Sequence, residues 1–203
     1  MKRFIDHFRV VLLDMGNTFM FGCDRFGDHT DYFATYTNLG GTSLSPGVVT
    51  SVIDNLLCSL LADYQNPECY EHFKQVADYL ARIPEARCLP RSELSLLEDV
   101  FAHHEVGRIP ADHVEVLQSL RETHSLGLIS NIWSRHPIFE TELKRAGVLD
   151  LFDLLVWSSD HGCIKPSLRL FKKAMEHFDI PGRKWCTLEM TRKGMSSGQK
   201  TPA

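Results

Sequence analysis

The side chains best suited to chemistry in this chain follow short apolar runs. Asp14 comes directly after four apolar residues, a run typical of a buried parallel strand. Ser130 and Asn131 close a second apolar run, and Lys165 lies in the loop after a third. Ligands of open α/β sheets bind outside the carboxyl ends of the strands. We therefore expect Asp14 to be held on a rigid element and to face such a crevice.

Each of these residues alone has an ordinary structural explanation. Asp and Ser-Asn are common turn residues after a strand, and a single Lys is usually a solvated charge. Together, and in this order, they fit phosphoryl transfer: a carboxylate attacks, a hydroxyl and an amide bind phosphate oxygens, and an ammonium group neutralises charge. The sequence therefore predicts that Asp14, Ser130 and Lys165 converge around one anion.

The elements that must position these residues alternate between strand and helix. Apolar runs predict strands at 10–13, 126–130 and 154–157, and helical spacing predicts helices at 111–123, 139–146 and 167–178. Short buried strands that alternate with helices of this length are typical of a parallel sheet with right-handed crossovers. The expected fold class is therefore α/β, with a doubly wound parallel sheet.

A helical block separates the first strand from the rest of this pattern, because no strand pattern appears between Phe26 and His104. Ser45 and Pro46 are suited to starting a helix, and apolar residues then recur at spacings of three and four. Shorter helices are expected to end at Gly40, to run from Phe73 to Pro84, and to begin at the cap residue Ser92. We expect residues 23–106 to form an inserted helical domain, and residues 1–22 and 107–203 to form the sheet domain.

The chain resembles the haloacid dehalogenase-like (HAD) hydrolase superfamily in the order and spacing of three motifs. They are VVLLDMGNT at 10–18, LGLISN at 126–131 and IKPSLRLF at 164–171, with the helical block between the first two. The resemblance implies a Rossmann-like core, a helical cap domain, and a phosphatase acting on a small phosphorylated metabolite.

The resemblance also assigns roles to individual residues. Asp14 would form an aspartyl-phosphate, Ser130 and Asn131 would bind the phosphate, and Lys165 would hold nucleophile and phosphate together. Magnesium would bridge the phosphate to Asp14 and to the backbone carbonyl of Gly16.

Gly16 departs from the phosphatase pattern, in which a second Asp serves as general acid and base at this position. A glycine keeps the carbonyl that binds metal but has no proton for the leaving group, and such assistance typically contributes about 10²–10⁴-fold in rate. Dehalogenase members of the superfamily also lack the second Asp. A metal-independent dehalogenase and an inactive remnant therefore stay open as alternatives.

The family's fourth motif, which supplies acidic metal ligands after an apolar strand, is missing, since no Asp occurs in residues 185–203. Met190 is encoded by ATG and Thr191 by a codon that begins AC, so the frame starting at the third base reads GAC, an Asp codon. We infer a frameshift near Pro181–Lys184, which resequencing of the gene would test. We expect the chain as written to have little activity and marginal stability, although residues 185–188 could still pair beside the first strand.

Composition excludes several classes of protein. The chain has 203 residues, 43% of them hydrophobic, which is enough for a substantial core. A net charge of −4 without a basic cluster argues against nucleic acid as a partner. The six cysteines form no C-x-x-C pair, and the N-terminus lacks the apolar length of a signal or membrane segment. We expect a cytoplasmic protein without a membrane partner, and the sequence gives no indication of its oligomeric state.

Overall fold

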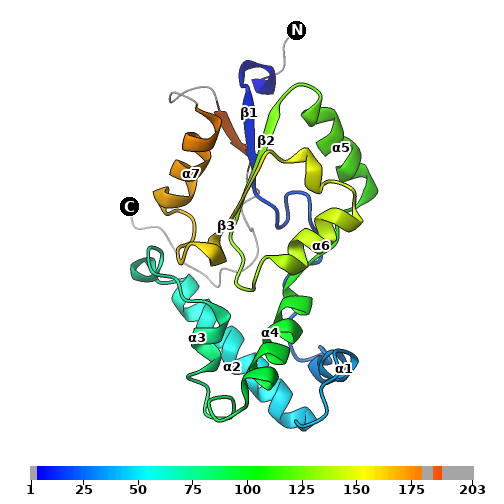
Figure 1. Cartoon of the computed structure of the whole chain (residues 1–203), viewed down its shortest axis with the longest axis vertical. Coiled ribbons are helices and arrows are strands. Elements are labelled where there is room, and N and C mark those ends of the chain that lie inside the picture. Colours follow the sequence, from blue (N-terminus) through cyan, green and yellow to red (C-terminus); the bar gives the residue numbers. More distant parts are fainter. Residues whose placement is uncertain (1–3, 180–184, 189–203) are drawn as a thin grey trace, which may run out of the picture.

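Four parallel strands form one sheet in the order β3-β2-β1-β4 in the computed structural model, which describes residues 4–179 and 185–188 (Figure 1). The strands are β1 (Val10–Leu13), β2 (Ser125–Ser130), β3 (Leu154–Trp157) and β4 (Trp185–Leu188). The parallel α/β sheet predicted from the sequence is thus confirmed. The remaining tail, including the part of the frameshift prediction that concerns residues 189–203, lies outside the described residues.

β1 lies inside the sheet, with β2 on one side and β4 on the other. Leu13 pairs with Leu128, so Asp14 follows β1 next to the last residues of β2. Leu13 also pairs with Leu188, which shows that residues 185–188 do pair beside the first strand. All four residues of β1 are buried, as a strand covered on both faces requires.

Helices cover both faces of the sheet (Figure 1). They are α5 (Ala111–Arg121) and α6 (Pro137–Arg145) on one face and α7 (Leu168–Phe178) on the other. Alternate residues of β1 face opposite sides: Val11 packs in the cluster of α5 and α6, whereas Leu12 packs in the cluster of α7. At Gly127 a Cβ atom would lie 2.7 Å from Leu12, so glycine permits this close contact. The sheet is therefore doubly wound, as predicted.

Helices α1–α4 lie between β1 and α5 in the sequence and gather beyond one end of the sheet (Figure 1). Their bounds are Tyr32–Asn38, Pro46–Tyr64, Val76–Leu80 and Arg91–Glu105. We call these four helices and their connections the helical insertion. Its apolar side chains form a cluster of their own, which Trp133 and Ile164 join from outside the insertion. By length and composition alone α2 could cross a membrane, but its apolar face packs within this cluster.

Two helix starts in the insertion differ from the sequence prediction. α4 begins at Arg91 with Pro90 at the N-cap, so Ser92 lies inside the helix rather than capping it. Proline is tolerated there because the first residues of a helix need no intrahelical N–H donor. α3 begins only at Val76, where the backbone N–H of Gln75 donates to the Asp78 carboxylate. Phe73 precedes that helix but is still buried in the apolar cluster.

Candidate active site

Asp14, Ser130 and Lys165 come together at the carboxyl ends of β1 and β2. The carboxylate oxygen Oδ1 of Asp14 lies 3.0 Å from the Lys165 Nζ atom and accepts a 3.3 Å hydrogen bond from Ser130 Oγ. The backbone N–H of Met15 donates to the same oxygen at 2.8 Å. Among the described contacts, none reaches the other carboxylate oxygen, Oδ2. One oxygen of Asp14 is therefore fixed by three donors, and the other is available for chemistry.

The local structure explains why these side chains are ordered. Ser130 is only 1% exposed because it ends an interior strand. The Lys165 side chain is 11% exposed, and its Nζ atom also donates to the Ile129 carbonyl at 3.2 Å. A partly buried ammonium group with two fixed acceptors interacts more strongly with a nearby anion than one in bulk water. The convergence predicted from the sequence is present, while the catalytic roles of these residues stay predictions.

Asn131 has contacts that the sequence did not predict. Its Oδ1 atom accepts a 2.8 Å hydrogen bond from the backbone N–H of Lys165, and its Nδ2 atom donates to Tyr64 Oη at 3.1 Å. Tyr64 is the last residue of α2, so this amide joins the helical insertion to the loop that carries Lys165. The Asn131 side chain therefore positions Lys165, whereas the sequence suggested only a phosphate ligand.

The oxygens available near Asp14 suit magnesium. Among the described hydrogen bonds, none uses the Gly16 carbonyl oxygen, so it can join the Asp14 carboxylate as a hard oxygen ligand. Within residues 4–179 and 185–188 no group of three or more His, Cys, Asp or Glu side chains could hold a metal. Magnesium commonly keeps several waters and is held by one or two carboxylates plus substrate phosphate. The oxygen ligands present thus fit a magnesium ion that arrives with a phosphorylated substrate.

Gly16 offers space but no proton. A Cβ atom at this position would have no heavy atom within 4 Å, so a side chain could be accommodated. Glycine has no side chain, so position 16 itself carries no carboxyl group. The absence of a proton donor at this position is therefore a matter of residue type and not of crowding.

Glu105, at the end of α4, is a buried carboxylate that the sequence prediction missed. It is 5% exposed, and its two oxygens accept hydrogen bonds from the backbone N–H groups of Trp133 (2.7 Å) and Ser134 (2.8 Å). Burial raises the pKa of Glu105 to about 7, although these hydrogen bonds oppose the rise. A signal was available in the sequence, because Glu105 follows the buried Leu97 and Phe101 at helical spacings of four.

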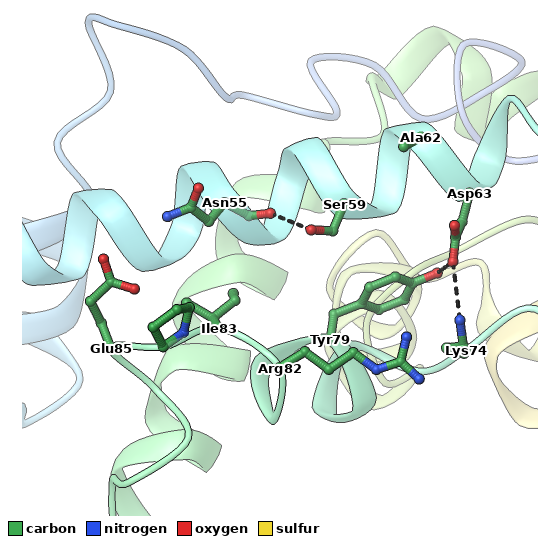
Figure 2. A pocket seen from close by; sticks show the side chains of 10 residues that line it. Asn55, Ser59, Ala62, Asp63, Lys74, Tyr79, Arg82, Ile83 and Glu85 are labelled. Atoms are coloured by element: carbon green, nitrogen blue, oxygen red, sulfur yellow. Dashed lines mark hydrogen bonds and ion pairs between the residues drawn. The ribbon is translucent and has the colours of Figure 1, made fainter.

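A separate cavity of about 550 Å³ lies within the helical insertion (Figure 2). It is lined by residues of α2 and of the segment from Lys74 to Glu85. Asp63 accepts hydrogen bonds from Tyr79 Oη at 2.8 Å and from Lys74 Nζ at 3.4 Å, so these polar groups satisfy one another (Figure 2). Neither Asp14 nor Lys165 lines this cavity, which is therefore distinct from the predicted site.

Comparison with known proteins agrees with this architecture. The family model of haloacid dehalogenase-like hydrolases matches residues 61–202, more than half of the chain. The chain belongs to this family. A curated relative, the pyrimidine 5′-nucleotidase YjjG of Escherichia coli, is 36% identical to this HAD-like hydrolase over 70 residues. That match covers 34% of this chain and 30% of the relative's length.

Solved structures show the same fold. A HAD family enzyme of Bacteroides thetaiotaomicron in a magnesium complex matches with a TM-score of 0.56 and 16% identity, covering 89% of this chain and 83% of that one. A 2-haloacid dehalogenase of Pseudomonas syringae matches with a TM-score of 0.55 and 17% identity, covering 89% and 76%. At identities this low, the structural matches show the Rossmann-like HAD fold alone. The chemistry of this hydrolase must be argued from its own residues. The family match covers residues 61–202 and does not include Asp14. The geometry at Asp14 therefore supports membership of the family independently of that match.

Proposed function

We propose that this HAD-like hydrolase is a magnesium-dependent phosphatase that acts on a small phosphorylated metabolite through an aspartyl-phosphate on Asp14. The observation that carries the proposal is the arrangement of donors at Asp14. Lys165 and Ser130 both reach Oδ1, and no described contact occupies Oδ2. Oδ2 is thus the oxygen suited to attack phosphorus, while the donors at Oδ1 lie close enough to bind phosphate oxygens as well.

The reaction has two steps that regenerate the protein. Asp14 attacks phosphorus, a bond forms between its carboxylate oxygen and phosphorus, and the bond to the leaving alkoxide breaks. Water then attacks the aspartyl-phosphate, which releases inorganic phosphate and restores the carboxylate. Lys165 neutralises negative charge in both steps, and the Ser130 hydroxyl donates to a phosphate oxygen.

Magnesium, held by the Asp14 carboxylate and the Gly16 carbonyl, would neutralise charge on the phosphoryl oxygens. Because Gly16 has no proton to donate, the leaving group must depart as an anion or take a proton from water. Turnover should therefore depend steeply on the acidity of the leaving alcohol. The missing fourth motif, which supplies acidic metal ligands in this family, is a separate reason to expect little activity from the chain as written.

We propose that the helical insertion, residues 23–106, acts as a cap over Asp14, since Tyr64 of α2 contacts Asn131 beside Ser130. The nucleotidase relative makes nucleoside 5′-monophosphates the first substrate class to test. A cytoplasmic location is part of the proposal, supported by the free thiols of Cys58, Cys69, Cys88 and Cys163, which suit a reducing compartment.

The test is hydrolysis of p-nitrophenyl phosphate and of uridine monophosphate, with magnesium and with a chelator. Because the fourth motif is missing from the sequence, we expect slow, magnesium-dependent release of phosphate and a covalently phosphorylated protein, both lost in Asp14→Asn. The matched control is Asp28→Asn, which changes an exposed carboxylate. Release of halide from a 2-haloacid without metal would instead identify a dehalogenase, and no covalent product with any substrate would identify a non-catalytic remnant.

A further inference from the structure

The junction between the helical insertion and the sheet contains a fully buried acid that the proposed reaction does not use. Glu105 is the last residue of α4, from which the chain continues toward α5. Its backbone carbonyl accepts a 3.1 Å hydrogen bond from the N–H of Asp24, in the segment that leads from β1 into the insertion. The two crossing segments of the chain therefore meet at Glu105.

The Glu105 carboxylate binds the loop that follows β2. Its oxygens accept from Trp133 and Ser134, which come two and three residues after Asn131. Asn131 in turn accepts from the backbone N–H of Lys165, whose Nζ atom reaches Asp14. A continuous series of short contacts thus joins Glu105 to the side chains of the candidate active site.

The charged groups around Glu105 are engaged elsewhere. Arg25 donates to the carbonyls of Gly22 (2.7 Å), Val106 (2.5 Å) and His103. On the loop side, Arg135 pairs with Glu98 and Asp99 of α4. His104 bonds to Thr35 through Nε2.

Asp24, the carboxylate that faces Glu105 from the entering segment, adds to the rise in the pKa of Glu105. The Ser134 side chain and the two backbone amides oppose the rise, and no cation among the described residues contributes to it.

We propose that Glu105 is a positioning residue that fixes the loop after β2 against the helical insertion and couples separation of the two to the release of a proton. In the closed arrangement the carboxyl group is buried, bonded to the loop and, below about pH 7, protonated. Separation of α4 from this loop would admit water to both oxygens. The coupling itself does not require turnover, whereas its effect on phosphate binding rests on the proposed function.

The direction of the coupling follows from the pKa of Glu105 in the two arrangements. Burial raises it from 4.5 to about 7 in the closed structure, and hydration returns it toward 4.5 on opening. The open form is therefore favoured as pH rises. The opening equilibrium should increase about tenfold per pH unit between roughly pH 5 and 7, and should level off above the closed-state pKa.

Hydrogen exchange at the amides of Trp133 and Ser134 tests the proposal in the full chain. After correction for the intrinsic pH dependence of exchange, we expect the opening constant to rise with pH as described. Glu105→Gln should abolish this dependence, and Glu105→Asp, which keeps a carboxyl group, should retain it. The matched control Glu115→Gln removes an exposed carboxylate from α5 and should leave the profile unchanged.

An opening constant independent of pH in the wild-type chain, or a dependence that persists in Glu105→Gln, would overturn the proposal. If Glu105→Gln does not fold, the carbon NMR signal of the Glu105 carboxyl group decides the matter: a midpoint near pH 7 supports it, and a midpoint near 4.5 contradicts it. Asp14→Asn, which cannot form an aspartyl-phosphate, should keep the wild-type exchange profile. A failed phosphatase assay therefore leaves this coupling separately measurable.

Discussion

At the scale of single residues, the chemistry depends on an asymmetry within one carboxylate. Three donors bind Oδ1 of Asp14, two of them from segments more than a hundred residues away in the sequence. In the proposed reaction this arrangement would hold the Asp14 nucleophile in one orientation before substrate arrives, which would lower the cost of reaching a reactive geometry. Lys165 is the only cation among these donors, and in the proposed reaction Gly16 leaves the leaving group without a proton donor at its position.

Replacing Lys165 with Met should weaken phosphate binding with little loss of shape, because the two side chains have similar length. Loss of one charge-assisted hydrogen bond costs about 1.5–3 kcal/mol, or roughly ten- to a hundredfold in affinity. Calorimetric titration with inorganic phosphate in the presence of magnesium measures the change. Lys172→Met, which removes an exposed lysine of α7, is the control. Equal affinities in the wild type and Lys165→Met would remove Lys165 from the phosphate site.

Gly16→Asp should supply the missing general acid. The position has open space for a Cβ atom, so the substitution should be tolerated. Turnover of alkyl phosphates, which need a proton on the leaving oxygen, should rise by about 10²–10⁴-fold. p-Nitrophenyl phosphate has a more stable leaving anion and should gain much less. Gly16→Asn has the same shape without the proton and serves as the control, so an equal gain in both variants would contradict the explanation.

At the scale of elements, α6 is anchored by one buried carboxylate. Glu142 accepts from the backbone N–H of Ile109 at 3.0 Å and pairs with Arg108 and Arg145. Its side chain is 4% exposed, whereas those of the two arginines are 72% and 51% exposed. Burial alone would raise the pKa of Glu142, but the hydrogen bonds from Arg145, Ile109 and Arg108 lower it to about 2.

The free energy of unfolding should therefore fall as the pH drops from about 4.5 toward 2, because Glu142 becomes protonated over this range. A lowered pKa in the folded state means that the contribution of Glu142 is present above its ordinary pKa of 4.5 and is lost as pH falls toward about 2. Glu142→Gln should lower the free energy of unfolding at pH 7 by about 1–3 kcal/mol and flatten its fall in acid. Urea unfolding at several pH values measures both effects, with Glu122→Gln as an exposed control. An unchanged acid slope would show that other carboxyl groups dominate.

The helices and strands were largely predictable from local patterns, because buried strands and amphipathic helices each produce a recognisable spacing of apolar residues over a short stretch of sequence. The strands Val10–Leu13 and Leu154–Trp157 have the predicted bounds, and Ser167 caps α7 as expected for its residue type. Contacts between distant segments were not predictable in this way. The use of Asn131 to hold Lys165, and of Glu105 to hold Trp133, depends on how the helical insertion lies against the sheet.

At the scale of the whole molecule, few apolar side chains of residues 4–179 join the helical insertion to the sheet. Trp133 and Ile164 extend from loops of the sheet into the apolar cluster of the insertion, where Trp133 packs near Phe101 and Tyr64. Trp157, by contrast, belongs to the cluster between the sheet and α6. The two buried tryptophans thus belong to different apolar clusters, so substitutions at Trp133 and Trp157 form a matched pair that compares the insertion with the sheet.

Trp133→Ala should loosen the insertion more than the sheet. Truncation of a buried tryptophan typically costs about 3–5 kcal/mol, and here the cavity would open inside the cluster of the insertion. Amide hydrogen exchange in α2 should accelerate accordingly, while exchange in β1 and β2 should change less. Trp157→Ala should show the reverse order, because its cavity adjoins the sheet. Equal losses in both regions for both variants would mean that insertion and sheet unfold as a single cooperative unit, so that opening at Glu105 could not occur without global unfolding.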